Sequence, residues 1–70
     1  MKLQYDQETD SLYIDLAARP SVDSREIQDG VVVDLDADGH IVGIDIQYAS
    51  KILDLDTVET SSLPPARRIQ

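Results

Sequence analysis

The residues on either side of Asp38 and Gly39 constrain the fold more than any other part of the sequence. The stretch is VVVDLDADGHIVGIDI, in which apolar and polar residues alternate before and after an Asp-Gly pair. An Asp-Gly pair favours a two-residue type I′ turn between antiparallel strands. Such a turn sends apolar side chains to one face and most carboxylates to the other, so it predicts a β-hairpin with one apolar face. The predicted pairs are Ala37–His40, Leu35–Val42, Val33–Ile44 and Val31–Ile46.

The same segment also has the spacing of a calcium-binding loop. Acids occupy its first, third, fifth and twelfth positions, with Gly39 at the sixth and Ile41 at the eighth. Such a loop needs a helix leading into its first ligand, whereas residues 31–33 are three valines, whose β-branched side chains disfavour helix. The hairpin is therefore the first interpretation. The alternative is a weak divalent-cation site with four ligands: Asp34, Asp36, Asp38 and Asp45.

Two further segments have a strand-like pattern. Residues 2–16 place apolar side chains two apart on either side of the polar stretch DQETD, which predicts a second hairpin. Asp29-Gly30 is a turn signal, because glycine tolerates positive φ and aspartate can bond its own backbone. For residues 24–28, around Ile27, the pattern is compatible with a strand and with a loop.

After Gln47 the spacing of apolar residues becomes helical. The residues concerned are Tyr48, Ala49, Ile52 and Leu53, which predict a short helix over about 48–54 lying on the apolar face of the sheet. The expected fold is α+β: a small antiparallel β-meander of four to five strands with one short C-terminal helix packed on one face. We expect a single domain over residues 1–58 and a flexible polar tail over residues 59–70.

Composition argues against several kinds of chemistry. The chain has no cysteine, which excludes disulfides, thiolate metal sites and thiol catalysis. Its single histidine, His40, lies in a predicted turn, and no serine has a glycine elbow or a nearby base, so we expect neither an enzyme nor a resident cofactor. The first residues lack the apolar core of a signal peptide and no apolar run is long enough to span a membrane, so we expect a cytoplasmic protein without membrane contact.

The charge balance indicates a class of partner. The chain has 14 acidic and 6 basic residues, for a net charge of -8. Such a surface repels nucleic-acid phosphates and suits a basic protein partner. The candidate partner-binding residues are Asp6, Glu8, Asp10, Asp34, Asp36 and Asp45. The face away from the predicted helix offers a homodimer seam at Tyr13, Val32 and Ile41, and the sheet edges at Leu3 and Ile27 could also pair between chains.

Two blocks of the sequence, YDQETDSLYIDL and DGVVVDLDADGHIVGIDIQYAS, resemble the family known as domain of unknown function 2283 (DUF2283). The likeness covers about residues 3–53, and Asp45 stands where the family pattern has glutamate. The resemblance implies a small antiparallel β-domain, mostly bacterial, with no established activity and no catalytic or binding residues to transfer. Some relatives are paired with small toxin-like proteins, which implies an antitoxin-type role.

These observations together predict a non-enzymatic protein-interaction module. Its acidic face would bind a basic partner, such as a small ribonuclease-like toxin whose RNA-binding surface it would block. The divalent-cation binder and the self-associating domain are the alternatives.

Overall fold

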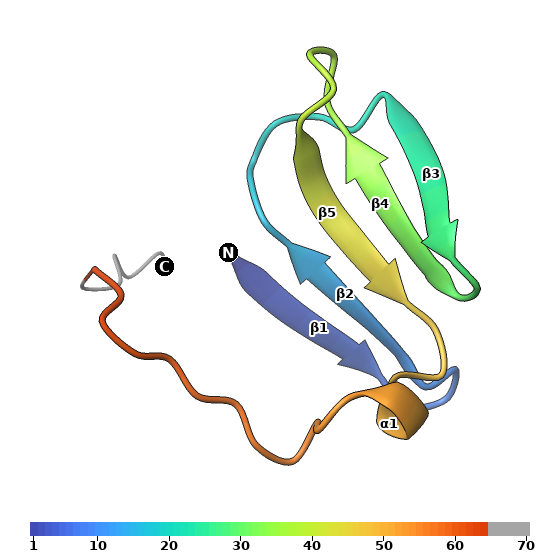
Figure 1. The fold of residues 1–70 in the computed structure, drawn as a ribbon, viewed down its shortest axis with the longest axis vertical. Helices are drawn as coiled ribbons and strands as arrows, with labels where there is room; N and C mark the ends of the chain where they lie inside the picture. The colour runs from blue at the N-terminus through green and yellow to red at the C-terminus, as the bar shows by residue number, and fades with distance from the viewer. Residues whose placement is uncertain (65–70) are drawn as a thin grey trace.

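The computed structural model describes residues 1–64 of the chain, which form one antiparallel sheet and one helical turn (Figure 1). The order of the five strands in the sheet is β1-β2-β5-β4-β3. The elements along the chain are β1 (Lys2–Asp6), β2 (Ser11–Asp15), β3 (Asp23–Gln28), β4 (Val31–Leu35), β5 (Ile41–Ile46) and α1 (Ala49–Ile52). The expected antiparallel sheet of four to five strands is confirmed with five, and the fold is mostly β.

The predicted meander order is wrong, because β5 pairs with β2 and separates it from β3 and β4. Residues 16–22 leave β2 and pass over the ends of β5 and β4 to reach β3 at the far edge of the sheet (Figure 1). Two local units, the β1–β2 hairpin and the β3–β4–β5 meander, are thus joined side by side. Local alternation specifies each unit but not which strand meets which.

The first hairpin agrees with the sequence prediction. Its register places Leu3 opposite Ile14 and Tyr5 opposite Leu12, so apolar residues of both strands share one face. The turn ends at Asp10, which has a positive φ of 53°. Aspartate is one of the few residues that adopts this left-handed conformation at modest cost.

The second hairpin follows the predicted register in the middle of its strands and departs from it at the turn. Val31 pairs with Ile46 and Val33 with Ile44 as predicted. Beyond Asp34 the register shifts, and Leu35 pairs with Ile41. Val42 is therefore the extra residue of a β-bulge. The predicted pairs Leu35–Val42 and Ala37–His40 are not formed.

The reason is a three-residue loop, Ala37–Gly39, in place of the two-residue turn. The Gly39 N–H donates to the Asp36 carbonyl at 3.0 Å, and the Asp36 N–H donates to the His40 carbonyl at 2.9 Å. Gly39 has a φ of 83°, a left-handed conformation that glycine adopts without strain. A turn followed by a left-handed residue is the usual three-residue hairpin loop. Because the loop has three residues while the middle of the hairpin keeps the predicted register, β5 accommodates one extra residue, Val42, between the two.

Residues 23–28 form a strand, which settles the choice that the sequence left open. β3 pairs with β4 along most of its length, with Glu26 opposite Val32. Between Glu26 and Gln28 the register shifts, so Ile27 is the extra residue of a second bulge, and 62% of it is exposed. The Asp29-Gly30 turn forms as predicted, with a φ of 80° at Gly30.

The core lies on the face of the sheet that carries the apolar residues of the two hairpins. Its buried members are Leu12, Val31, Val33, Leu35, Val42, Ile46 and Ala49. Leu53 and Leu55 pack against part of this cluster from the segment that follows α1. The face is covered by these single side chains rather than by a long helix.

The predicted short C-terminal helix is confirmed, but it is shorter than the predicted span of residues 48–54. α1 has only four residues and lies at one end of the sheet, beside the β1–β2 turn (Figure 1). It cannot begin earlier because Tyr48 is left-handed (φ 55°), and it ends because Leu53 is extended. Ala49 is fully buried, whereas Tyr48 and Ile52 are exposed, contrary to the prediction.

The end of the chain is only partly described. Residues 59–64 contain no helix or strand, and residues 65–70 of the predicted tail lie outside the described residues. Within residues 1–64, no helix is long and apolar enough to cross a membrane.

Candidate functional site

The surface of the sheet opposite the core is strongly acidic. Residues that face each other in antiparallel strands share a face, and alternate residues along a strand return to it. The registers therefore place five acids on one surface, which we call the acidic face: Asp6, Asp15, Glu26, Asp34 and Asp45. Among the described strand residues, Lys2 is the only basic one on this face.

A hydrogen-bonded network holds the acidic face together across four strands. The ring of Tyr13 on β2 lies over Gly43 on β5, and its hydroxyl donates to Asp34 Oδ2 on β4 at 2.8 Å. The Ser24 hydroxyl on β3 donates to Asp34 Oδ1 at 2.7 Å. Both oxygens of Asp34 are thus engaged.

Position 43 requires glycine because of this arrangement. A Cβ there would lie 2.7 Å from Tyr13 Cζ, closer than real Cβ atoms approach a neighbour. The absence of a side chain lets the tyrosine ring cross β5 and reach the next strand. The glycine of the sequence VGID therefore has a packing role rather than a role in a turn.

The pKa of the Tyr13 phenol reflects the negative charge of the acidic face. Its pKa is raised to about 12, first by the hydrogen bond to Asp34, then by burial, and further by the negative charges of Asp34, Asp15 and Asp45. The phenol therefore stays protonated and keeps donating its hydrogen bond at neutral pH. A face that disfavours a further negative charge favours a positive one.

Asp10, a predicted partner-binding acid, lies in the turn between β1 and β2, and its carboxylate is hydrogen-bonded to other residues of the same chain. Its carboxylate accepts hydrogen bonds from the Tyr5 hydroxyl at 2.7 Å, the Ser50 N–H at 3.0 Å and the Ser50 hydroxyl at 2.7 Å. Its carbonyl accepts the Ala49 N–H at 2.8 Å. The Tyr5 hydroxyl and then Ser50 lower the pKa of Asp10. Asp10 therefore fastens the first hairpin to α1.

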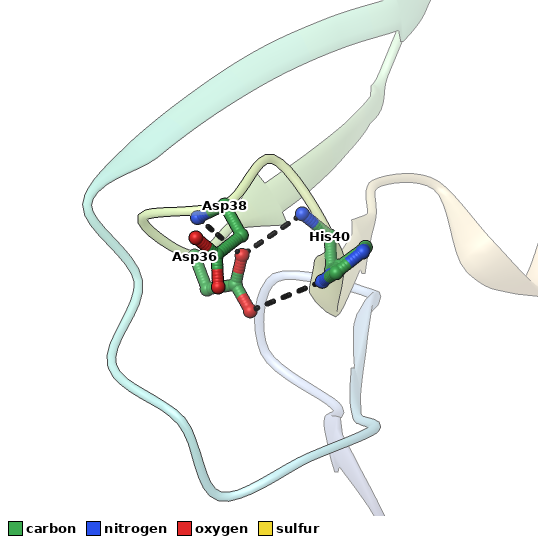
Figure 2. Close-up of side chains that lie close together, drawn as sticks. All are labelled: Asp36, Asp38 and His40. Atoms are coloured by element: carbon green, nitrogen blue, oxygen red, sulfur yellow. Dashed lines mark hydrogen bonds and ion pairs between the residues drawn. The ribbon is translucent and has the colours of Figure 1, made fainter.

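Asp36 performs a similar structural task in the loop of the second hairpin (Figure 2). Only 6% of the residue is exposed. Its Oδ1 accepts the N–H groups of Asp38 and His40, both at 2.9 Å, and its Oδ2 accepts Arg19 Nε at 2.7 Å. The His40 N–H and then the Arg19 guanidinium lower the pKa of the Asp36 carboxyl.

The four predicted cation ligands lie in two different places. Asp36 and Asp38 lie in the loop, where they can bring ligand atoms within 4.8 Å of one another and of His40. Asp34 and Asp45 lie on the acidic face and are not part of that group. Figure 2 shows that the interactions of the loop group converge on Asp36. Asp36 also forms an ion pair with Arg19, whose side chain is not drawn in that view.

The predicted dimer seam also divides. Tyr13 and Val32 are half-buried and both pair with Asp45, so they lie among the carboxylates of the acidic face. Ile41 is 46% exposed and sits beside the bulge near the loop. The remaining predicted partner-binding acid, Glu8, is exposed in the β1–β2 turn, where its N–H donates to Asp6 Oδ1 at 3.0 Å.

Two acids of the face and one ion-pair partner were missed from the sequence. Asp15 lies two residues after Tyr13 on the same strand, so alternation would have placed it. Glu26 required knowledge that residues 23–28 form a strand. Arg19 reaches Asp36 from an irregular loop, for which the sequence contains no periodic signal.

Comparison with known proteins identifies a family but no activity. The family model described as "Protein of unknown function (DUF2283)" matches residues 2–50, well over half of the chain. The match confirms the resemblance that the two sequence blocks indicate. No curated protein and no solved structure matches the chain.

Proposed function

The chain belongs to the DUF2283 family, and we propose that it is a non-enzymatic protein-interaction module whose acidic face binds a basic protein. The observation that supports this most is the gathering of five acids on one sheet surface, where the described strands contribute a single basic residue, Lys2. A negative surface that meets a positive surface on a partner accelerates their encounter and selects the partner's orientation.

The acidic face is built to keep its shape when it is bound. The Tyr13–Asp34–Ser24 network spans four strands, so a partner would meet carboxylates at fixed spacings. Asp15, Glu26 and Asp45 have no hydrogen bond to another side chain among those found in residues 1–64, which leaves them free to accept from outside. Arginine suits such positions, because its planar guanidinium donates two parallel hydrogen bonds to one carboxylate.

The partner that fits this chemistry is a protein with a surface rich in lysine and arginine. RNA-binding proteins have such surfaces, and a small ribonuclease-like toxin is a member of that class. An acidic face placed over a toxin's RNA-binding surface would exclude the RNA by occupying the same cations. This antitoxin role rests on charge and on the family resemblance.

Co-expression with the product of a neighbouring gene tests the proposal. A basic product is expected to co-purify at low salt and to be released as salt is raised, because exposed charges are screened. If no basic neighbour co-purifies at any ionic strength, the antitoxin version fails.

A pair of matched triple variants tests the face itself. Asp15→Asn/Glu26→Gln/Asp45→Asn removes three charges from the acidic face, whereas Asp29→Asn/Asp54→Asn/Glu59→Gln removes three exposed charges from elsewhere. An oligoarginine peptide, measured by calorimetry, is expected to bind the first variant about tenfold more weakly than the second. Equal affinity for the two variants would show that only net charge matters.

Cation binding at the loop is the second candidate, supported by the closeness of Asp36, Asp38 and His40. Any ion there must compete with Arg19 for the Asp36 carboxylate, so this candidate function has less support than the first. A cation bound only by the folded chain would raise the melting temperature, and Arg19→Gln would strengthen that effect. No shift at millimolar calcium or zinc in either protein would exclude the candidate.

A further inference from the structure

The two outer strands of the sheet differ in how well they are protected against pairing. The unpaired backbone groups of an edge strand attract another strand unless charges, a bulge or a covering element prevent it. β3 has both protections, a bulge at Ile27 and adjacent charges at Arg25 and Glu26. β1 pairs with β2 in an unbroken register, and no described strand lies on its outer side (Figure 1).

The apolar side chains of β1 are also incompletely covered. Leu3 and Tyr5 lie on the core face of the sheet, opposite Ile14 and Leu12, yet 52% and 46% of them remain exposed. They line an open groove of about 540 Å³, whose opposite wall includes Leu55 and Val58 from the segment after α1. The core therefore ends unsealed at the β1 edge.

The sequence of β1 is complementary to itself. In an antiparallel pair of β1 strands centred on Gln4, Lys2 faces the partner's Asp6, and Leu3 faces the partner's Tyr5. Directly opposed residues of opposite charge, and directly opposed apolar residues, stabilise such pairs. Paired residues in this register are an even number of positions apart, so the core faces of the two sheets lie on the same side.

Charge favours this edge over the other. Each chain has a net charge of -8, so two copies repel one another over most of their surfaces. The lysine and the aspartate of β1 cancel, whereas β3 paired with itself at Arg25 or at Glu26 would bring like charges together. The β1 edge therefore combines side chains of opposite charge, Lys2 and Asp6, with two half-exposed apolar side chains, Leu3 and Tyr5.

We propose that two copies associate through their β1 strands, forming a continuous ten-stranded antiparallel sheet in which Lys2 pairs with the partner's Asp6. The two grooves then lie side by side around the two-fold axis, and the two acidic faces form one surface. The inference does not depend on the proposed function, because it requires only the purified chain.

Light scattering after size exclusion, over a series of concentrations, tests the association. The purified chain is expected to form a concentration-dependent dimer, and a chain that stays monomeric up to about 1 mM overturns the proposal. Leu3→Asp places a charge at the apolar contact and is expected to give a monomer with an unchanged circular-dichroism spectrum. A Leu3→Asp protein that dimerises as strongly as the original chain assigns the dimer to another surface.

A charge swap tests the register. Lys2→Asp alone and Asp6→Lys alone should each weaken the dimer about tenfold, because two symmetry-related pairs become repulsive. The double variant Lys2→Asp/Asp6→Lys restores opposite charges and should recover the affinity. A double variant as weak as the single variants contradicts the register. Arg25→Asp, on the β3 edge, is the control and should leave the dimer intact.

Discussion

The two faces of this sheet are stabilised by different kinds of interaction. The core face is held by burial of apolar side chains such as Val33 and Ile46, whose contacts have no required direction. The acidic face is held by a directional network, in which Tyr13 crosses Gly43 to reach Asp34. A five-stranded sheet of this size can therefore leave one face open to water without leaving it disordered in structure.

The difference explains how the chain combines stability with an exposed charged surface. Carboxylates placed side by side repel one another, and the network offsets this by supplying donors from a tyrosine and a serine. The donors bind Asp34, at the centre of the face, and leave Asp15 and Asp45 free. The stabilising contacts are thus the apolar core and the hydrogen bonds of Asp34, and the carboxylates without such bonds lie around Asp34.

The largest difference between the faces should appear when apolar side chains are shortened. Ile46→Ala removes a core side chain that is 8% exposed and should lower the free energy of unfolding by about 2–5 kcal/mol. Ile27→Ala makes the same chemical change in a strand at a residue that is 62% exposed and should cost within about 0.5 kcal/mol. Urea denaturation measures both, and equal losses would contradict the assignment of the core.

The next largest effect should come from filling the space over β5. Gly43→Ala forces the Tyr13 ring out of its place and should cost about 1–3 kcal/mol in urea denaturation. In a Tyr13→Ala background the obstacle is gone, so the same substitution should be neutral or stabilising. Additive costs in the double variant would show that the ring does not lie over Gly43.

A smaller effect should follow from removing the hydrogen bond of the network. Tyr13→Phe keeps the ring and should cost about 1 kcal/mol at neutral pH. The raised pKa of Tyr13 predicts that this contribution is complete below the unfolded value of about 10 and is lost as pH rises towards about 12. Tyr13→Phe should therefore remove part of the alkaline loss of stability.

Absorbance at 295 nm gives an independent check of the same network. One of the three tyrosines should ionise at about 12, and Asp34→Asn should move that ionisation closer to the ordinary value. A titration that Asp34→Asn leaves unchanged would show that the carboxylate does not hold the phenol.

The smallest change in the free energy of unfolding should be seen at acidic pH. It should come from two carboxylates in turns at the ends of the sheet, Asp10 and Asp36, rather than from residues on its faces. The lowered pKa values of Asp10 and Asp36 mean that both stabilise the fold above the unfolded value of about 3.9. That stability is lost as pH falls through the lower folded values. Asp36→Asn should flatten the decline in denaturation midpoint between about pH 5 and pH 2, whereas Asp54→Asn, at an exposed position, should not.

Sequence reasoning succeeded where a period of two residues decides the structure. Val31–Ile46 and Val33–Ile44 pair as predicted, because a slip by one residue would expose the whole core face. It failed at the loop, where the Asp36 side chain binds backbone N–H groups and selects three loop residues over two. It predicted a short helix but overestimated its length, because Tyr48 takes a left-handed conformation that apolar spacing does not reveal.

The candidate site was predicted in the same partial way. Alternation placed Asp34 and Asp45 on one face, which the structure confirms by register. It could not show that Asp10 and Asp36 are bound internally, because their partners Ser50 and Arg19 are distant in sequence. Strand order also depends on long-range contacts, so Glu26 could be placed on the acidic face only once the pairing of all five strands was known.

The most direct test of the account is a map of where a basic ligand contacts the folded chain. Titrating an oligoarginine peptide into the ¹⁵N-labelled protein should shift the amide signals of Asp15, Glu26, Asp34 and Asp45, with little change in the α1 segment. Shifts spread over all exposed acids, or centred on the loop from Asp36 to His40, would contradict the claim that the acidic face is the binding surface.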